Sequence, residues 1–474
     1  MVPKYKKASS TLFFLCIGLI FSSCSNNYYD NINLGKGYEY QPGFPELRFA
    51  ASGLIDDFGD PYILISGDIV KGSLIYSASG EKFQANASLS IRVSNHQTND
   101  VLVNESYEIT ITDDSGNIVN SQDIEHFEYN YKVPAGNYIV EATITDKNSE
   151  KWTYRSTQTV IPNSETNESH ITEIQILAKK SKEAQSDFKQ ATTYDIPLEY
   201  DSLKFVFQVT NNFAEPINIT STLIKFRADT APPRFMNELN YTPSSIGYIG
   251  IDFDKRELIE SSTRNLNQKG SVIVELPFEN LETGNYLIEI HLSKNGENEI
   301  FKGRGFSIKP DNYPSLKTPK ELAEPLYFLM EKNAYEQLLK INDPDSLKNS
   351  IDKFWLTYIN NAVIAKQVVS SYYQRVEEAN KQFSNFKEGW KTDRGMIYIL
   401  FGPPWHTNIY NNKLYWSYSH NRTDPDLNFV FERPQLNSKY FPFDHFILTR
   451  SSSYFSTQYN QIERWKNGSI LYRD

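Results

Sequence analysis

The spacing of hydrophobic residues changes along the chain. Between about residues 45 and 310, short runs of alternating apolar and polar residues are separated by clusters of Gly, Asn, Asp, Ser and Pro. This arrangement is typical of antiparallel strands with one buried face. Beyond residue 319, apolar residues recur every three or four positions, which indicates amphipathic helices. The pattern therefore predicts a β-rich N-terminal part, followed by a region that begins with helices.

Two segments of the β-rich part repeat the same turn and strand. Gly-Asn-Tyr occurs at residues 136–138 and again at residues 284–286, and each copy opens a strand with one apolar face. The two faces consist of Tyr138, Val140, Ala142 and Ile144, and of Tyr286, Ile288, Ile290 and Leu292. We therefore predict two tandem antiparallel β-sandwich (Ig-like) domains, at residues 45–163 and 172–310. In patterning they resemble the Ig-like and macroglobulin-like modules of secreted proteins, a likeness that says little about function.

The last part of the chain, residues 319–474, is predicted to be an α+β domain. Apolar residues at helical spacing follow Asp343, which is placed to cap a helix, and they continue to residue 383. The uninterrupted apolar run at residues 396–401 is interpreted as a strand buried on both faces, ended by Gly402 and two prolines. Further strands are expected at residues 413–418, 427–431 and 445–449. The prediction is thus helices first and then a small antiparallel sheet.

Two long stretches of the second β region show no regular pattern. They are residues 179–194 and residues 230–248. Structureless loops of this length are uncommon unless they serve a function or are disordered. For the second stretch two interpretations stay open, a contact surface for a partner and a loop laid over a neighbouring domain.

Residues 1–23 have the features of an export signal. Lysines precede an apolar core that is too short to span a bilayer, and small residues stand immediately before Cys24. This arrangement resembles the lipidation site of bacterial lipoproteins, with Phe21 in place of the usual leucine. An ordinary secretory signal, with Cys24 incidental, is the alternative. We predict acylation of Cys24, followed by a polar tether at residues 24–44.

An acylated Cys24 would anchor the protein to a membrane, because two or more acyl chains give firm binding. No aspartate follows the cysteine, which favours the outer membrane, and no acidic run resembling a surface-export signal follows it, which favours the periplasmic face. The formal net charge of −10 argues against nucleic acid as a partner. Cys16 lies inside the signal, so the processed chain retains one cysteine and forms no internal disulfide.

Residues 389–395, Gly-Trp-Lys-Thr-Asp-Arg-Gly, stand where the helical pattern ends. The first glycine suits the left-handed conformation that often follows a helix. Thr392 and Asp393 are short polar side chains suited to turns, Trp390 can pack back onto the helix, and Arg394 is placed to pair with Asp393 or another carboxylate. The group is either a ligand-binding or catalytic cluster or the contact that locks helix to sheet. Packing explains nearly every member, so we prefer the second interpretation.

This stretch, with Ile-Tyr-Ile-Leu-Phe-Gly-Pro-Pro at residues 397–404, resembles the motif of the GWxTD-domain family of exported proteins from Bacteroidetes-type bacteria. The resemblance covers residues 320–405 and includes the helical lead-in at residues 372–383. The chain departs from the family pattern in lacking an Arg-Asp-Pro cluster soon after Trp355 and an aspartate after Pro404. A polar site built from those positions would be incomplete. The family's biochemical role is undefined, so the resemblance implies an exported lipoprotein and an architecture, but no reaction.

Motifs that carry catalysis are scarce. The sequence contains no HExxH, CxxC, Walker or GxSxG motif, and its histidines never occur at metal-ligand spacing, so neither a cofactor nor a metal is expected. Residues 79–82 and 384–387 match the SxxK spacing without the companion motifs. A His–Asp pair is the remaining acid/base candidate. Its members would come from His406, His420 and His445 on one side and Asp393 and Asp444 on the other.

Two functions follow from these observations. The preferred one is a non-enzymatic lipoprotein whose C-terminal domain binds an envelope protein or a glycan through Trp390, Thr392, Asp393 and Arg394. The alternative is a cell-envelope hydrolase with an Asp/His site in the same domain. A solidly packed corner favours the first, and an open cleft with Asp393 beside a histidine favours the second.

Overall fold

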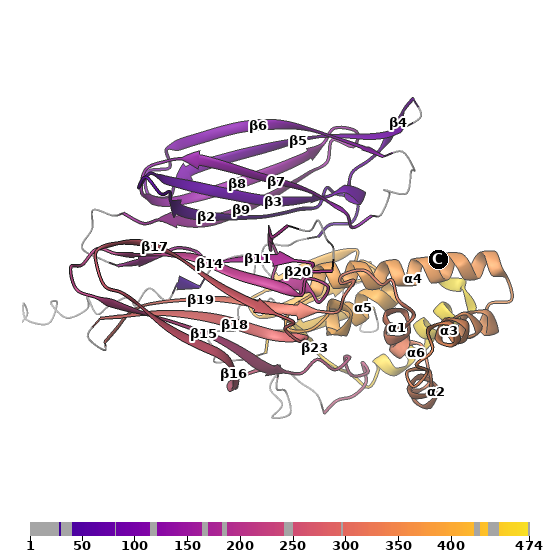
Figure 1. Cartoon of the computed structure of the whole chain (residues 1–474). Coiled ribbons are helices and arrows are strands. Elements are labelled where there is room, and N and C mark those ends of the chain that lie inside the picture. The colour runs from indigo at the N-terminus through magenta and orange to yellow at the C-terminus, as the bar shows by residue number, and fades with distance from the viewer. Residues whose placement is uncertain are drawn as a thin grey trace, which may run out of the picture.

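The computed structural model describes residues 28–29, 40–80, 82–113, 121–163, 169–182, 187–240, 250–294, 297–420, 427–434 and 445–472. Figure 1 shows two β-sandwiches lying one above the other, with a mainly helical part at one end of the lower sandwich. Cys24 and Asp444 lie outside the described residues, so what we expect of them stays a prediction.

The first sandwich consists of antiparallel sheets that face each other. One sheet has the order β2 (Leu47–Ile55), β3 (Pro61–Val70) and β7 (Ile124–Lys132), and η1 (Lys71–Ser73) follows β3. The other has the order β4 (Ser77–Ser79), β5 (Lys82–Asn95), β8 (Gly136–Asp146) and β9 (Trp152–Ile161), with β6 (Val101–Asp113) also paired to β5. Inward-facing residues of both sheets, such as Ile65 and Leu89, form one buried core.

The second sandwich repeats this layout with a longer main sheet. That sheet has the order β1 (Tyr28–Tyr29), β19 (Glu297–Lys309), β18 (Gly284–Lys294), β15 (Ile217–Ala228) and β16 (Ile251–Leu266), with β13 (Asp195–Pro197) also on β19. The facing sheet has the order β10 (His170–Ile171), β14 (Ser202–Asn211), β11 (Gln175–Lys179) and β12 (Lys189–Gln190), with β17 (Gly270–Glu279) on β14. β1, from the predicted tether, pairs in parallel with β19.

The repeated Gly-Asn-Tyr turn is a shared structural device. Gly136 and Gly284 open β8 and β18 with φ of 157° and 156°. The hydroxyl of Tyr138 donates to the carbonyl of Pro134 at 2.7 Å, and that of Tyr286 donates to the carbonyl of Glu282 at 2.8 Å. Each buried tyrosine thus ties its strand to the turn that precedes it. The two predicted β-sandwiches and their apolar faces are confirmed.

The C-terminal part begins with helices. They are α1 (Pro319–Ala323), η2 (Glu324–Phe328), α2 (Lys332–Leu338), α3 (Pro344–Tyr358), α4 (Ala362–Phe383), η3 (Gly389–Lys391) and α5 (Asp393–Phe401). An antiparallel sheet follows, in the order β20 (His406–Tyr410), β21 (Lys413–Ser417), β22 (Asn428–Glu432) and β23 (Ile447–Leu448), and then α6 (Tyr454–Asn467) and η4 (Ser469–Leu471). Asp343 caps α3, since its carboxylate accepts from the N–H of Ser346 at 2.8 Å. The predicted order of helices before a small sheet is confirmed.

One predicted element is wrong. Residues 396–401 belong to helix α5 and not to a strand, so the sheet begins at β20. Thr392 caps the helix by accepting from the N–H of Gly395, and Gly402 ends it with φ of 85°. Residues 395–400 are all buried, and an element buried on every side shows no alternation by which helix and strand can be told apart.

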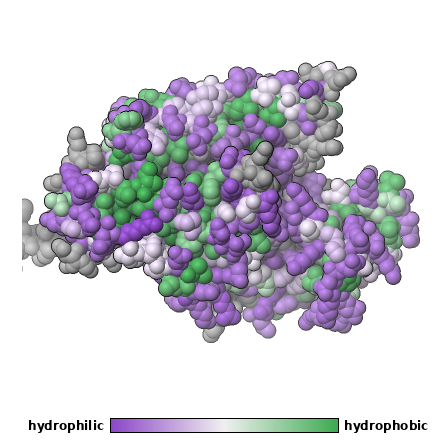
Figure 2. All heavy atoms as spheres, viewed as in Figure 1, coloured by the Kyte–Doolittle hydropathy of each residue, from purple (hydrophilic) through white to green (hydrophobic). Residues whose placement is uncertain are grey.

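Buried polar contacts join the first sandwich to the rest of the molecule. Glu46, which is 2% exposed, pairs with Lys381 of α4 at 2.9 Å. The amide of Gln208 on β14 exchanges hydrogen bonds with the backbone of Ile55, at 2.9 and 2.6 Å. The face in Figure 2 is mainly hydrophilic, with hydrophobic groups in scattered patches. Within the described residues, no helix is long and apolar enough to cross a membrane.

Candidate functional site

The GWKTDR corner, residues 389–394, is a point of very close backbone packing. A Cβ on Gly389 would lie 2.0 Å from the carbonyl oxygen of Ala379 on α4, and a Cβ on Gly395 would lie 2.1 Å from the carbonyl oxygen of Gly389. Thr392 closes the turn, because its Oγ1 donates to Gly389 O at 2.7 Å and accepts from Gly395 N at 3.0 Å. A glycine is therefore needed at position 389 because the backbone of α4 lies so close. The expected left-handed conformation is wrong, since Gly389 does not have a positive φ.

Trp390 is part of the hydrophobic core and is only 3% exposed. Its ring meets Phe328 edge-on, with centroids 6.0 Å apart, and Lys391 Nζ lies 5.1 Å from the centre of the indole. Its backbone N–H donates to Asn380 Oδ1 at 3.1 Å, which anchors the corner to α4. The backbone of Trp390 is thus bonded to the preceding helix, whereas its ring packs against Phe328 of η2.

Asp393 is held by a residue 57 positions away. Arg450 donates to both of its carboxylate oxygens at 2.9 Å, and the N–H of Leu448 donates to Oδ2 at 2.7 Å. The Arg450 side chain is 0% exposed and that of Asp393 is 6% exposed. Asp393 therefore pairs with Arg450 and not with Arg394, and pairing of Arg394 with another carboxylate stays a prediction. Arg394 instead lies over the rings of Phe383 and Phe446, at 5.1 and 5.3 Å from their centroids.

Arg450 also binds the segment at residues 229–240, which we call the strap. Its guanidinium donates to the carbonyls of Arg234 and Phe235, each at 3.1 Å. Met236 of the strap is 0% exposed and is buried in the core of the C-terminal part. Apart from Asp229, the strap is the described portion of the irregular stretch at residues 230–248, and it lies over the neighbouring domain. Asp393, through Arg450, therefore fastens the second sandwich to the C-terminal domain.

A cavity of about 140 Å³ lies beneath the strap. It is lined by nine residues, among them Asp229, Arg234, Lys387, Asp393 and His445. Burial lowers the pKa of Lys387, with Asp229 and Asp393 opposing the shift, and Lys387 Nζ donates to Ala231 O at 3.0 Å. Burial also lowers the pKa of His445 well below its usual value, reinforced by Lys387 and Arg394. The imidazole is therefore neutral, and its Nδ1 accepts from Asn385 Nδ2 at 2.8 Å.

Only part of the predicted His–Asp arrangement is assembled. Of the three candidate histidines, His445 shares the cavity with Asp393. His406 is exposed at the start of β20, and the ring of His420 lies 4.6 Å from that of Trp405. Both carboxylate oxygens of Asp393 are occupied by Arg450 and Leu448. A carboxylate so engaged is poorly placed to accept a proton from a substrate.

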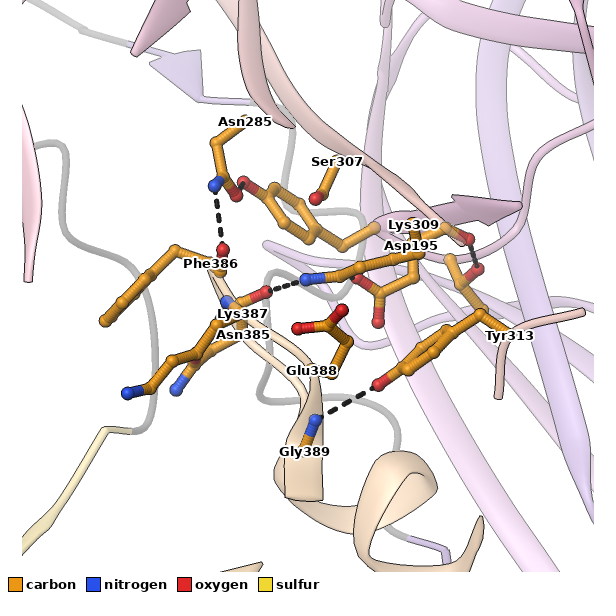
Figure 3. A network of polar contacts seen from close by, with 12 residues as sticks. Asp195, Asn285, Ser307, Lys309, Tyr313, Asn385, Phe386, Lys387, Glu388 and Gly389 are labelled. Atoms are coloured by element: carbon orange, nitrogen blue, oxygen red, sulfur yellow. Dashed lines mark hydrogen bonds and ion pairs between the residues drawn. The ribbon is translucent and has the colours of Figure 1, made fainter. Parts of the chain in front are cut away.

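A second buried polar network holds the other side of the corner (Figure 3). Lys309 Nζ donates to Asn385 O at 2.7 Å and pairs with Asp195 at 3.5 Å, while Asn285 Nδ2 donates to Phe386 O at 2.7 Å. Burial raises the pKa of Asp195 and lowers that of Lys309, and each group opposes the shift of the other. Side chains on strands β13, β18 and β19 thus hold in place residues 385–386, which lead into the corner.

Lys387 and Arg450 are the site residues that sequence reasoning did not single out. Lys387 had appeared only in a weak SxxK match, and Arg450 belongs to no motif. In the part of the chain that the structure describes, no group of three or more His, Cys, Asp or Glu side chains is arranged to hold a metal. The site is therefore a set of buried contacts that joins the second sandwich to the C-terminal domain, with a small cavity beside it.

Among solved structures, similarity is weak. The chain is 10% identical to red sea bream transglutaminase (TM-score 0.18), covering 56% of this chain and 31% of that one. It is 12% identical to Salmonella alpha-2-macroglobulin reacted with methylamine (TM-score 0.19), covering 59% and 17%. It is 9% identical to the C-terminal domain of the Streptococcus pyogenes antigen I/II-family protein AspA (TM-score 0.17), covering 55% and 99%. The chain spans less than a third of the first two proteins, and at these scores the likenesses carry no argument.

The family comparison is specific. No curated protein matches the chain. The family model of the GWxTD domain matches residues 288–467, from within β18 to the end of α6. The match contains the corner, its partner Arg450 and most of the β18–β19 hairpin that grips it. Residues 288–467 of this chain therefore match the GWxTD domain.

Proposed function

We propose that the protein is a lipid-anchored component of the cell envelope that binds a partner without turnover, and that the GWKTDR corner fixes its C-terminal domain to the sandwiches. The observation that carries this proposal is the state of Asp393. It is buried, and its carboxylate is fully engaged by Arg450 and the N–H of Leu448. Trp390 and Thr392 are likewise engaged in packing and in closing the turn. The motif therefore supports a fixed shape, and the partner is an envelope protein or a glycan.

Affinity isolation tests the partner-binding role. The tagged full chain is isolated from native membranes beside Asp393→Ala and a control, Asp352→Ala, whose carboxylate is half exposed on α3. We expect Asp393→Ala to lose the proteins or glycans that co-purify with the wild type and with the control. Circular dichroism establishes that each variant stays folded. Unchanged partners in a folded Asp393→Ala protein would contradict a role of the corner in presenting the binding surface.

The lipid anchor is supported by the sequence of residues 1–24. Labelling cells with an alkyne fatty acid is expected to mark the wild type and Cys16→Ser but not Cys24→Ser, which should also leave the membrane fraction. Protection from added protease in intact cells is expected for display on the periplasmic face. Label on Cys24→Ser, or digestion in intact cells, would contradict the respective part of the proposal.

A hydrolase is the second candidate, and the cavity beneath the strap is the observation that favours it. Lys387 with a lowered pKa and a neutral His445 share that cavity with Asp393. Such groups are often found where proton transfer occurs. The purified chain is incubated with isolated peptidoglycan and with ester and glycoside substrates, beside Lys387→Met. Turnover that Lys387→Met abolishes would replace the binding proposal with the enzyme, and we expect none.

A further inference from the structure

A polar groove lies where the three parts of the molecule meet. It has a volume of about 600 Å³, within the range of about 300–1,000 Å³ that small-molecule sites occupy. We call it the junction groove and define it by Asp68, Gln122, Gln190, Thr193, Tyr200 and Ser315, which are among its lining residues. These residues come from the first sandwich, from the segment around β12 and β13, and from the entry to the GWxTD domain.

The charges along the groove are largely compensated within the protein. Lys180 pairs with Glu199 at 3.0 Å. Asp68 is bound by His126 at 2.8 Å and by the hydroxyl of Thr192 at 2.7 Å. Carboxylates and cationic side chains both line the walls, so neither sign prevails. A strongly charged polymer would meet repulsion as well as attraction, and the groove therefore favours a neutral polar ligand.

The amides in the groove have unused hydrogen-bonding capacity. Gln190 Nε2 and Gln122 Oε1 are buried and have no hydrogen-bond partner among the described residues. Gln190 is 7% exposed as a residue. Buried polar atoms are nearly always paired, so unpaired ones beside a cavity indicate a missing partner. One of these atoms is a donor and the other an acceptor, which suits a ligand whose groups do both.

Aromatic rings add a surface of a different kind. Tyr200 and Tyr313 line the same groove as the amides. Aromatic faces carry negative partial charge and attract positively polarised hydrogens. The C–H groups of a sugar ring supply such hydrogens, and its hydroxyls both donate and accept hydrogen bonds. Amide groups and aromatic faces together are therefore complementary to a carbohydrate.

We propose that the junction groove binds a neutral oligosaccharide, with Gln190 and Gln122 bonding its hydroxyls. This rests on the proposed function, in that it names the glycan as the partner that is bound without turnover. The site is separate from the corner, and it depends on the corner only for the relative placement of the domains that form its walls.

Calorimetric titration of the purified full chain in detergent tests the proposal. The probes are neutral hexasaccharides (maltohexaose, cellohexaose, xylohexaose, mannohexaose and chitohexaose), with a polygalacturonate fragment as the acidic comparison. We expect one of the neutral probes to bind and the acidic one not to. Gln190→Met should weaken that binding at least tenfold. Gln175→Met is the matched control, because Gln175 Nε2 is also buried without a partner but does not line the groove. It should stay within twofold of the wild type.

Different failures have different meanings. Absence of binding by every neutral probe, binding of the acidic probe alone, or equal affinities of Gln190→Met and Gln175→Met would overturn the groove proposal. Recovery of the bound saccharide and its mass determination test the proposed function separately. An intact saccharide supports binding without turnover. A shortened one would contradict the non-enzymatic function, while the effect of Gln190→Met would still assign the site.

Discussion

At the scale of single residues, the Asp393–Arg450 pair is the contact on which the corner most depends. Asp393→Asn would leave the fully buried guanidinium of Arg450 without its compensating charge. Breaking a buried ion pair costs about 3–5 kcal/mol, so we expect the free energy of unfolding in urea, followed by tryptophan fluorescence, to fall by that amount. Asp352→Asn, at a half-exposed pair with Lys348, should cost about 0.5 kcal/mol or less. Equal losses in the two variants would contradict this assignment.

Gly389 supports a second prediction. In Gly389→Ala the new methyl group would lie 2.0 Å from the carbonyl oxygen of Ala379, and a helix backbone cannot yield as a side chain can. We expect a loss of at least about 3 kcal/mol, the upper end for overpacking. Gly59→Ala is the control, since its Cβ meets nothing within 4 Å and only its φ of 89° is strained, at about 1–2 kcal/mol. Thermal unfolding midpoints compare the two. A midpoint for Gly389→Ala at or above that of Gly59→Ala would refute the close-packing argument.

His445 supports a prediction about pH. Its pKa in the folded state lies well below 6.5, so below pH 6.5 the unfolded chain binds more protons than the folded one. The contribution of His445 to the free energy of unfolding is therefore present above pH 6.5. As the pH falls below that value, this contribution is lost, by up to about 1.4 kcal/mol per pH unit. His445→Asn keeps an acceptor for Asn385 and does not titrate, so its stability should decline less between pH 7 and pH 5. Other groups titrate alike in both proteins, so parallel urea-unfolding curves would show that His445 contributes nothing.

At the scale of elements, local patterns were sufficient for most of the fold. Alternation placed the strands, and the two Gly-Asn-Tyr turns identified strands that begin the same way in both sandwiches. Helix α3 followed from its spacing and its Asp343 cap. The pattern failed at α5, because a helix enclosed by α4, α6 and the sheet is apolar all round. Periodicity identifies an element only when one of its faces is polar.

Only part of the candidate site could be predicted from the sequence, for a related reason. The turn chemistry of Thr392 depends on nearby residues and could be predicted, whereas the contact of Trp390 with Phe328 of η2 could not. The partner of Asp393 could not, because Arg450 follows β23, 57 positions along the chain, and no spacing rule relates the two residues. The strap could not either, since its contacts join residues more than 200 positions apart. Contacts of that kind are determined by the tertiary fold.

The strap is the element whose role is most directly testable. Met236→Ala removes a 0% exposed side chain from the GWxTD core, which should cost about 2–5 kcal/mol. The N–H of Ser451 donates to Met236 O at 3.2 Å, so its hydrogen exchange should speed up when the strap loosens. Leu239→Ala, 54% exposed on the same strap, is the control and should change neither quantity. Unchanged exchange at Ser451 in Met236→Ala would show that the strap is held by other contacts.

At the scale of the whole molecule, the GWxTD domain depends on parts outside its helices and sheet. The second sandwich supplies Met236 to its core and Lys309 and Asn285 to the segment before the corner. A fragment of residues 319–474 lacks all three, leaving a cavity and unpaired backbone carbonyls, whereas residues 169–474 retain them. We therefore expect the longer fragment to unfold cooperatively, with a midpoint close to that of the full chain. The shorter fragment should unfold at least about 10 °C lower or not fold. The reason is that each kcal/mol of lost stability lowers the unfolding midpoint of a domain of this size by roughly 2–4 °C. Calorimetry of the two fragments decides. Equal midpoints would mean that the domain is autonomous and that its contacts with the second sandwich only orient it.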